Sequence, residues 1–525
     1  MDGESRRSLL DDFQDAQAVS ILRAPNGGEA CGSVTGPRNE QRAKQILGGE
    51  KTEGAGVEMP TIGEEIKTQV LIALPMIVMN LLQFSILIVS VMFVGHLGSL
   101  ELASASLATS VTNVLGLYIL MGMAGSLETL CGQAYGAKQY HMLEIYVQRA
   151  VFVLCCTCVP LTILFLKIES ILLLAGQTPE ISSKAAEYVF WLLPALYASA
   201  FLQPLIKFLQ TQSIVRPMAY CAAAALAIHV LLCWFFVFKL GLGYRGVAMA
   251  TSISYWANVV LLATFVKVSN CCDRTWVNGI SREAFTDLLP FMRLSVASTV
   301  MLCLEYWAFE IMVLAAGWLA NPQLEVSALA IGLNTSGLSY TIPTGLSAAA
   351  STRVSNELGA GRPLAVRRAI KVVLTTSFGV AIIVSSSLFL SRDSWGFIFS
   401  KDLEVVSKVS TIVPFLCCVI LFDGFQGVLA GIFKGAGWQD AGAMINFTCF
   451  YVFGIPTGMI LSFYFGWDCK GLWTGMITGL GIQVIGLSYI CSRTNWDEQT
   501  EIAYTRQRKA RSSTDDVHAA ESIYP

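Results

Sequence analysis

The most informative stretch of the chain is Pro343-Thr-Gly-Leu-Ser-Ala-Ala-Ala-Ser-Thr-Arg-Val-Ser-Asn-Glu-Leu-Gly-Ala-Gly361, because the chain holds an earlier version of it. The earlier version is Gly122-Met-Ala-Gly-Ser-Leu-Glu-Thr-Leu-Cys-Gly-Gln-Ala-Tyr-Gly-Ala137. An offset of 223 residues aligns identical residues of the two copies: Gly122 with Gly345, Thr129 with Thr352, Gly136 with Gly359 and Ala137 with Ala360. Each copy ends an apolar run with a polar turn, which indicates two halves of similar build.

The composition places both halves in a membrane. The chain has 525 residues, of which 54% are hydrophobic and 14% are charged, whereas soluble domains carry about 25% charged residues. Residues 68–100 contain no Lys, Arg, Asp or Glu, which is enough for one span of about 20 residues. Twelve spans are predicted: about 69–94, 102–127, 147–166, 188–206, 217–238, 246–266, 291–318, 325–350, 370–391, 409–433, 441–465 and 471–492. A duplicated membrane protein with a site between its halves is the usual plan of a secondary transporter.

These spans predict an all-α integral membrane protein with two pseudo-symmetric six-helix lobes. The expected parts of the chain are a disordered tail at 1–66, a first lobe at 67–268, a loop at 269–287, a second lobe at 288–492 and a second tail at 493–525. If both tails share one side, that side holds 27 of the 35 Lys and Arg residues. The excess of basic residues predicts that both termini are cytoplasmic.

Several classes of protein are not favoured. Most of the fifteen cysteines lie in apolar spans without nearby histidines, so we expect packing roles, no metal site and no cofactor. Only one of the four histidines, His229, lies well inside a span, so no catalytic constellation is visible and an enzyme is not expected. A channel would need rings of repeated charge, and the sequence shows none. The net charge of −2 gives no indication of nucleic-acid binding.

Three carboxylates interrupt the apolar spans of the second lobe: Glu305, Glu310 and Asp423. An acid at mid-membrane costs about 2.5–3.5 kcal/mol on insertion scales, so such groups usually face a cavity or a partner. Each is a candidate proton-coupling group, and a structural hydrogen bond to a neighbouring helix is the alternative. Glu305 and Glu310 are five residues apart, about 140° around a helix, so both cannot point straight at one cavity.

Other residues are candidates for substrate contact or for movement. Asn80 and Gln83 share one helical face and suit equally a cavity or a bond between helices. The rings of Tyr306, Tyr340 and Tyr451 could face a planar or cationic ligand, although packing is the commoner role. Pro343 and Gly345 are the best candidate for a hinge, with a fixed kink as the alternative.

Two charged residues near the cytoplasmic ends of spans have other expected roles. Glu128 ends its span beside the first polar turn, where we expect a gate or structural contact more than a substrate site. Lys434 ends an apolar run and is expected to anchor its helix at the membrane interface.

The sequence resembles the multidrug and toxic compound extrusion (MATE) transporters, specifically their plant branch. The resemblance covers about 65–495, and the tails match nothing. The similar segments are Leu74-Pro-Met76, Met92-Phe-Val-Gly-His-Leu-Gly98, Glu128–Ala137, Phe208-Leu-Gln-Thr-Gln-Ser213, Cys303–Glu310, Pro343–Gly361, Gly437-Trp-Gln439 and Lys470-Gly-Leu-Trp473. The block that ends at Gly361 is long enough to be highly specific.

The resemblance implies alternating access between two lobes and proton-driven export of organic compounds such as alkaloids, flavonoids or xenobiotics. It places Glu305, Glu310 and Asp423 at the positions of the second-lobe acids of eukaryotic relatives. The first span lacks the acid of many prokaryotic members, which favours coupling in the second lobe. Asn334, a further candidate for substrate contact, stands near a position where animal members carry Glu.

The expected partners are a small organic substrate, protons and the bilayer, for a monomer in the vacuolar or plasma membrane. A lipid-linked precursor flippase and a citrate exporter are the alternative functions. The flippase would need a strongly cationic cavity, which the second-lobe spans do not show.

Overall fold

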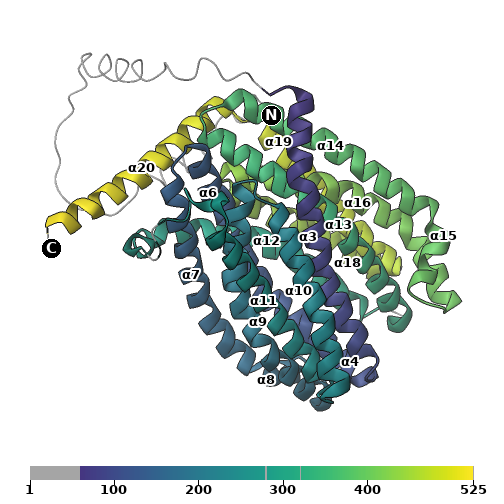
Figure 1. Cartoon of the computed structure of the whole chain (residues 1–525). Coiled ribbons are helices and arrows are strands. Elements are labelled where there is room, and N and C mark those ends of the chain that lie inside the picture. The colour runs from purple at the N-terminus through teal and green to yellow at the C-terminus, as the bar shows by residue number, and fades with distance from the viewer. Residues whose placement is uncertain (1–59, 278, 280, 320, 524–525) are drawn as a thin grey trace, which may run out of the picture. The chain divides into compact units, whose positions relative to one another are not determined.

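The computed structural model describes residues 60–277, 279, 281–319 and 321–523, and all regular structure in them is helical. Most of the predicted tail at 1–66 therefore lies outside the described residues. Figure 1 shows the long helices running side by side. Within the described part, eleven helical stretches are long and apolar enough to cross a membrane.

The first lobe holds six of these stretches. They are α3 (Ile62–Gly95), the stretch Ser99–Gly136, α7 (Tyr140–Leu166), α9 (Pro179–Thr211), the stretch Arg216–Lys239 and α11 (Gly243–Val268). The second stretch consists of α4 (Ser99–Thr112), a π-helical turn (Asn113–Leu117), α5 (Tyr118–Ala124) and α6 (Ser126–Gly136). The fifth joins α10 (Arg216–Trp234) to a π turn (Phe235–Lys239), and the short α8 (Ile168–Leu174) follows α7.

The second lobe holds the other five. They are α12 (Leu288–Ala316), α14 (Pro363–Leu390), α16 (Leu403–Ala436), the stretch Gln439–Tyr464 and α19 (Asp468–Arg493). The stretch Gln439–Tyr464 alternates α17 (Gln439–Asn446) and α18 (Ile455–Met459) with π-helical segments (Phe447–Gly454 and Ile460–Tyr464). The short α15 (Arg392–Trp395) precedes α16.

The twelfth predicted span, 325–350, is part of α13 (Pro322–Gly359), a helix of 38 residues. It is not among the eleven apolar stretches, because serines, threonines, glycines and Asn334 interrupt its apolar residues. Helix α13 packs against α16, α3 and α6. A helix enclosed by other helices can be rich in small and polar residues, which allow close packing and hydrogen bonds between helices.

The two copies of the repeated sequence cross each other where α6 meets α13. A Cβ atom at Gly136 would lie 2.0 Å from the carbonyl oxygen of Asn356, and one at Gly359 would lie 2.0 Å from that of Gln133. Gln133 and Asn356 are themselves related by the offset of 223 residues. Each copy therefore contacts the equivalent position of the other, as expected for two lobes related by an approximate twofold axis.

A second pair of contacts repeats this relation. A Cβ at Gly122 would lie 2.6 Å from Cα of Thr299 in α12, and one at Gly345 would lie 2.3 Å from Cγ1 of Ile77 in α3. Gly122 and Gly345 are equivalent in the repeat, and α3 and α12 are the first long helices of the first and second lobes. The glycines thus let helices of the two lobes approach closely at matching places.

The end of the molecule where α6, α13 and α19 finish is called the terminal end here. Helix α20 (Trp496–Ile523) begins there and contacts α6, α13 and α14, so it touches both lobes. Its buried residues Trp496, Thr500, Ala503 and Gln507 recur at helical spacing. Arg506 donates a hydrogen bond of 2.8 Å to the side-chain oxygen of Gln133 in the first lobe.

The crossing of α6 and α13 gives a test of the fold. Gly359→Ala should destabilise the protein by about 1–3 kcal/mol, because its methyl group would clash with backbone. Gly379→Ala is the matched control, because a Cβ at Gly379 in α14 meets nothing within 4 Å. Thermal unfolding of both purified variants measures the difference. Equal stability of the two variants would contradict the close crossing.

Candidate functional site

Glu305 lies at the meeting point of three second-lobe helices. Its carboxylate, on α12, is buried. Tyr340 of α13 donates its hydroxyl to one oxygen at 3.1 Å, and Gln426 of α16 donates its side-chain amide to the other at 2.7 Å. Both carboxylate oxygens therefore accept a hydrogen bond from an uncharged donor, and neither bond neutralises the charge of the carboxylate.

Asp423 is the second acid of this site. It is buried, and it precedes Gln426 by three residues, so both side chains leave the same face of α16. Gln426 links the two acids, because its amide bonds Glu305 and Asp423 lies about one turn before it on α16. Among the described residues, neither carboxylate forms an ion pair with a lysine or arginine. Two negative charges in one apolar site repel each other, so the arrangement favours a shared or exchangeable proton.

Glu310 occupies different surroundings. Its side chain is only half-buried, and it accepts a hydrogen bond of 3.3 Å from Ser110 of α4 in the first lobe. Glu305 is bonded within the second lobe, whereas Glu310 reaches across to the first. The two acids therefore belong to different contacts.

Aromatic residues join the lobes beside Glu305. Tyr306 stacks on Tyr118 of α5, with ring centroids 4.1 Å apart and planes 17° from parallel. Trp307 donates its indole N–H to the carbonyl oxygen of Val114, at 3.3 Å. Tyr306 and Trp307, the two residues that follow Glu305, therefore contact the first lobe.

The other predicted contact residues are dispersed. Asn80 donates to the hydroxyl of Thr344 at 3.3 Å, across the lobes, and Gln83 is half-buried one turn further along α3. Asn334 is exposed on α13. Tyr451 stacks on Phe447 with centroids 5.7 Å apart, and its buried hydroxyl has no hydrogen-bond partner in the described part of the chain.

Of these four residues, only Asn334 is well exposed. It lies eleven residues before Gly345, hence within about 20° of the face that packs on α3. It stands about three turns from that contact, toward the end of the molecule opposite the terminal end.

The predicted hinge lies inside an unbroken helix. Helix α13 runs from Pro322 to Gly359 with Pro343 inside it. A Cβ at Gly427 of α16 would lie 3.2 Å from the ring of Pro343, and Gly345 packs against Ile77 and the carbonyl oxygen of Ala73. Close packing is therefore a sufficient reason for Gly345, independent of any bending.

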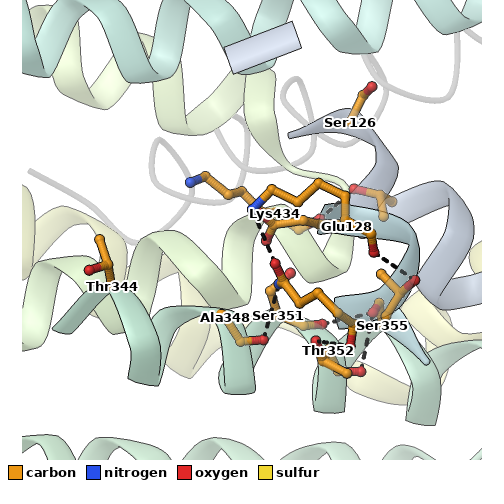
Figure 2. Close-up of polar contacts among 12 residues, drawn as sticks. Ser126, Glu128, Thr344, Ala348, Ser351, Thr352, Ser355 and Lys434 are labelled. Atoms are coloured by element: carbon orange, nitrogen blue, oxygen red, sulfur yellow. Dashed lines mark hydrogen bonds and ion pairs between the residues drawn. The ribbon is translucent and has the colours of Figure 1, made fainter. Parts of the chain in front are cut away.

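Glu128 belongs to a buried polar cluster near the terminal end, which Figure 2 shows. Its carboxylate accepts from the amine of Lys207 at 2.5 Å, and both side chains are largely buried. Lys434 lies beside this pair (Figure 2), and its carbonyl oxygen accepts the hydroxyl of Thr129. The side chain of Lys434 is half-buried, and the expectation that it anchors its helix at the membrane interface stays a prediction.

The structure also adds residues that sequence reasoning missed. Gln426 had a detectable signal, because it is polar and lies three residues from Asp423 in an apolar helix. Tyr118 and Ser110 had none, because their partners lie roughly 190 to 200 residues further along the chain, and only the folding of the first lobe against α12 brings each pair together. Within the described residues, no group of three His, Cys, Asp or Glu side chains is arranged to hold a metal ion.

A duplicated helical bundle that holds buried acids where its membrane helices meet is the usual architecture of a secondary transporter. The MatE family model matches residues 75–235 and 297–460, one segment in each lobe and more than half of the chain, so this chain belongs to the MATE family of transporters. The resemblance inferred from the sequence motifs is thereby confirmed, and so is the assignment to transporters and not enzymes.

The plant DETOXIFICATION proteins are among its relatives. It is 48% identical to Protein DETOXIFICATION 16 of Arabidopsis thaliana over 87% of this chain and 94% of the relative. It is 45% identical to Protein DETOXIFICATION 17 of the same plant over 87% of this chain and 96% of the relative.

Solved structures show the same fold. The crystal structure of the eukaryotic MATE transporter AtDTX14 superposes with a TM-score of 0.82 at 40% identity, over 85% of this chain and 99% of that one. An outward-facing multidrug resistance MATE family transporter, 16% identical, superposes with a TM-score of 0.73 over 86% of this chain and 99% of that one. The all-α membrane fold predicted from the sequence is therefore confirmed.

The pair of Glu128 and Lys207 gives a test of the polar cluster. Lys207→Met should destabilise the protein by about 3–5 kcal/mol, because it leaves a buried carboxylate without its partner. Lys184→Met is the control, because Lys184 pairs with Glu101 at 2.6 Å in a more exposed position, where an ion pair contributes little. Chemical denaturation of both variants measures the difference. A small loss for Lys207→Met, like that of the control, would show that Glu128 does not depend on this pair.

Proposed function

We propose that this protein exports organic compounds from the cytosol by antiport with protons, and that Glu305 and Asp423 carry the protons. The observation that supports this most is that both carboxylates are buried and that neither has an ion-pair partner among the described residues. A carboxylate fixed by a lysine or arginine would stay ionised through the cycle. This pair can instead take up and release a proton.

Proton state and lobe contact are joined through α12. Glu305 is bonded to Tyr340 and Gln426, and the next residue, Tyr306, stacks on Tyr118 of the first lobe. A change in the charge of Glu305 therefore acts next to Tyr306, the residue that contacts the first lobe. This is the local link that coupled transport requires, because a bound proton must bias one arrangement of the lobes.

The described state favours access from the end opposite the terminal end. Near the terminal end the lobes share hydrogen bonds, such as Gln210 to the carbonyl oxygen of Ala348 and Asn356 to that of Thr211. At the opposite end, α4 packs mainly on first-lobe segments. With both termini in the cytoplasm, as the 27 basic residues on that side predict, this state faces outward or toward the vacuole.

Pro343 is the proposed hinge for the change of state. It removes one backbone hydrogen bond from α13, the helix that contacts both lobes, and it faces Gly427, where α16 has no side chain to oppose movement. A bend there would separate the terminal ends of the lobes while α13 stays attached to α16.

The acid site also bears on the substrate. Two acids that need a proton to coexist suit neutral or cationic organic compounds, such as alkaloids, flavonoids or xenobiotics, better than citrate, whose charge they would repel. The stacked Tyr306 and Tyr118 offer aromatic faces to a planar compound. The names DETOXIFICATION 16 and 17, carried by relatives, agree with such substrates.

Substitution of the acids tests the coupling site. Asp423→Asn and Glu305→Gln should each abolish substrate accumulation driven by a pH gradient in proteoliposomes while preserving expression, because each removes a titratable group with little change in volume. Glu310→Gln is the matched comparison and should have a milder effect, because Glu310 contacts Ser110 outside the acid pair. Wild-type accumulation by either of the first two variants would exclude that residue as the coupling site.

The ion gradients test the energy source. Transport should follow the proton gradient and ignore sodium, because the acids lie in the second lobe and residues 68–94 of the first span contain none. One inward charge at 100 mV is worth about 2.3 kcal/mol, enough for roughly 50-fold accumulation of a neutral substrate. Uptake into vesicles with each gradient imposed alone measures this. Accumulation driven by sodium with the pH gradient collapsed would reverse the assignment.

A further inference from the structure

A groove of about 650 Å³ opens beside α16 near the terminal end, apart from the acid site. Helices α14 and α19 both pack on α16 and supply its walls, and Leu429 of α16 lies at its base. Trp496, the first residue of α20, closes one side. We propose that this groove binds one anionic phospholipid of the surrounding bilayer.

The groove changes from charged to apolar with depth. Arg367 and Lys371 lie within the first three turns of α14, next to the terminal end, and both are exposed. Ile370 and Leu374 lie on the same wall, and Leu374 is about 10 Å further along the helix axis than Arg367. Leu429 at the base is fully buried. Cations at the rim and aliphatic side chains below match a phosphate headgroup with an acyl chain beneath it.

Both cations are available to a phosphate. Lys371 forms no ion pair with any described residue, and Arg367 pairs at 2.8 Å only with Asp497, in a contact where both side chains are at least half exposed. Exposed ion pairs are weak, so a phosphate can replace the aspartate. An arginine guanidinium also matches phosphate oxygens with two parallel hydrogen bonds.

The bilayer is the natural source of this ligand. The terminal end is the side with the excess of basic residues, and the cytoplasmic leaflet of a membrane carries anionic lipids that basic residues near its surface attract. A free phosphate could bind Arg367 and Lys371 at the rim but would make no apolar contact with Ile370, Leu374 and Leu429. The apolar depth therefore favours a lipid over a soluble anion.

The site also touches the helix that bridges the lobes. Trp496 packs on Trp438 with ring centroids 5.2 Å apart, and Asp497 is the residue that a phosphate would release from Arg367. Ten residues after Trp496, Arg506 reaches Gln133 of the first lobe. A bound lipid therefore changes the contacts that hold the start of α20.

Native mass spectrometry of the full-length protein tests the proposal, with phosphatidylglycerol and phosphatidylcholine of identical chains as probes. Phosphatidylglycerol should bind one molecule tightly, and phosphatidylcholine should bind weakly. Arg367→Ala and Lys371→Ala should each weaken phosphatidylglycerol about fivefold, since a basic residue near anionic lipid contributes about 1 kcal/mol. Lys371→Arg should bind as the wild type does, and so should Lys267→Ala, which removes an exposed lysine from the last turn of α11.

A variant that leaves the charges intact tests the apolar depth. Leu374→Trp should fill the groove and weaken phosphatidylglycerol, with thermal unfolding as the check that the variant folds. Equal binding of the two lipids, or unchanged binding by both alanine variants, would overturn the proposal. Displacement of the lipid by glycerol 3-phosphate at equal concentration would show a soluble-phosphate site instead. All these readouts are independent of transport, so their failure is distinct from a failure of the antiport proposal.

Discussion

The whole structure depends on the close approach of backbone to backbone where α6 crosses α13. Gly136 and Gly359 have no side chains to separate the helices, and each meets a carbonyl oxygen of the other copy. At this separation side chains of one lobe can bond the backbone of the other, as Gln133 does to Gly435 at 3.3 Å. Lipid tails are as apolar as the helices, so packing and such bonds must hold the lobes together.

The acid site follows from this frame. Helix α13 is held by the first lobe through Gly345 and Gly359 and by α16 through Gly427 and Gly431. That double contact places Tyr340 beside α16 and within reach of Glu305. A shift of α13 relative to α12 would therefore break a bond to the acid and alter the contact between lobes at the same time. We infer that chemistry and movement are joined by this shared helix.

The sequence was sufficient for the architecture because its signals are one-dimensional. Apolar runs have a length set by the bilayer, and the repeat is visible as matching residues such as Gly136 and Gly359. The isolated acids stand out for the same reason. The polarity of α13 is less informative, because a helix surrounded by protein need not be apolar. Its length and contacts, not its hydropathy, identify it as a counterpart of the helices around it.

The partners of the acids were not predictable in the same way. Gln426 lies on the face of Asp423, but nothing in the sequence shows that it reaches Glu305 on another helix. Gly345 suggested flexibility, whereas the structure shows close packing against α3, since a glycine serves either purpose. Lys434 follows an apolar run as an interface anchor would, but its surroundings depend on how α6 meets α16. The surroundings of all three residues depend on distances between helices, which a local sequence pattern does not contain.

In this mechanism, the proton state of Glu305 and Asp423 selects the arrangement of the lobes. Pulsed electron paramagnetic resonance on spin-labelled pairs in nanodiscs tests it most directly, with one pair at Lys138 and Arg362 near the terminal end and another at Leu174 and Leu403 at the opposite end. We expect opposite changes of the two distances between pH 5 and pH 8, and no change when Glu305 is replaced by Gln and Asp423 by Asn. A pH-dependent change that persists in that double variant would contradict it.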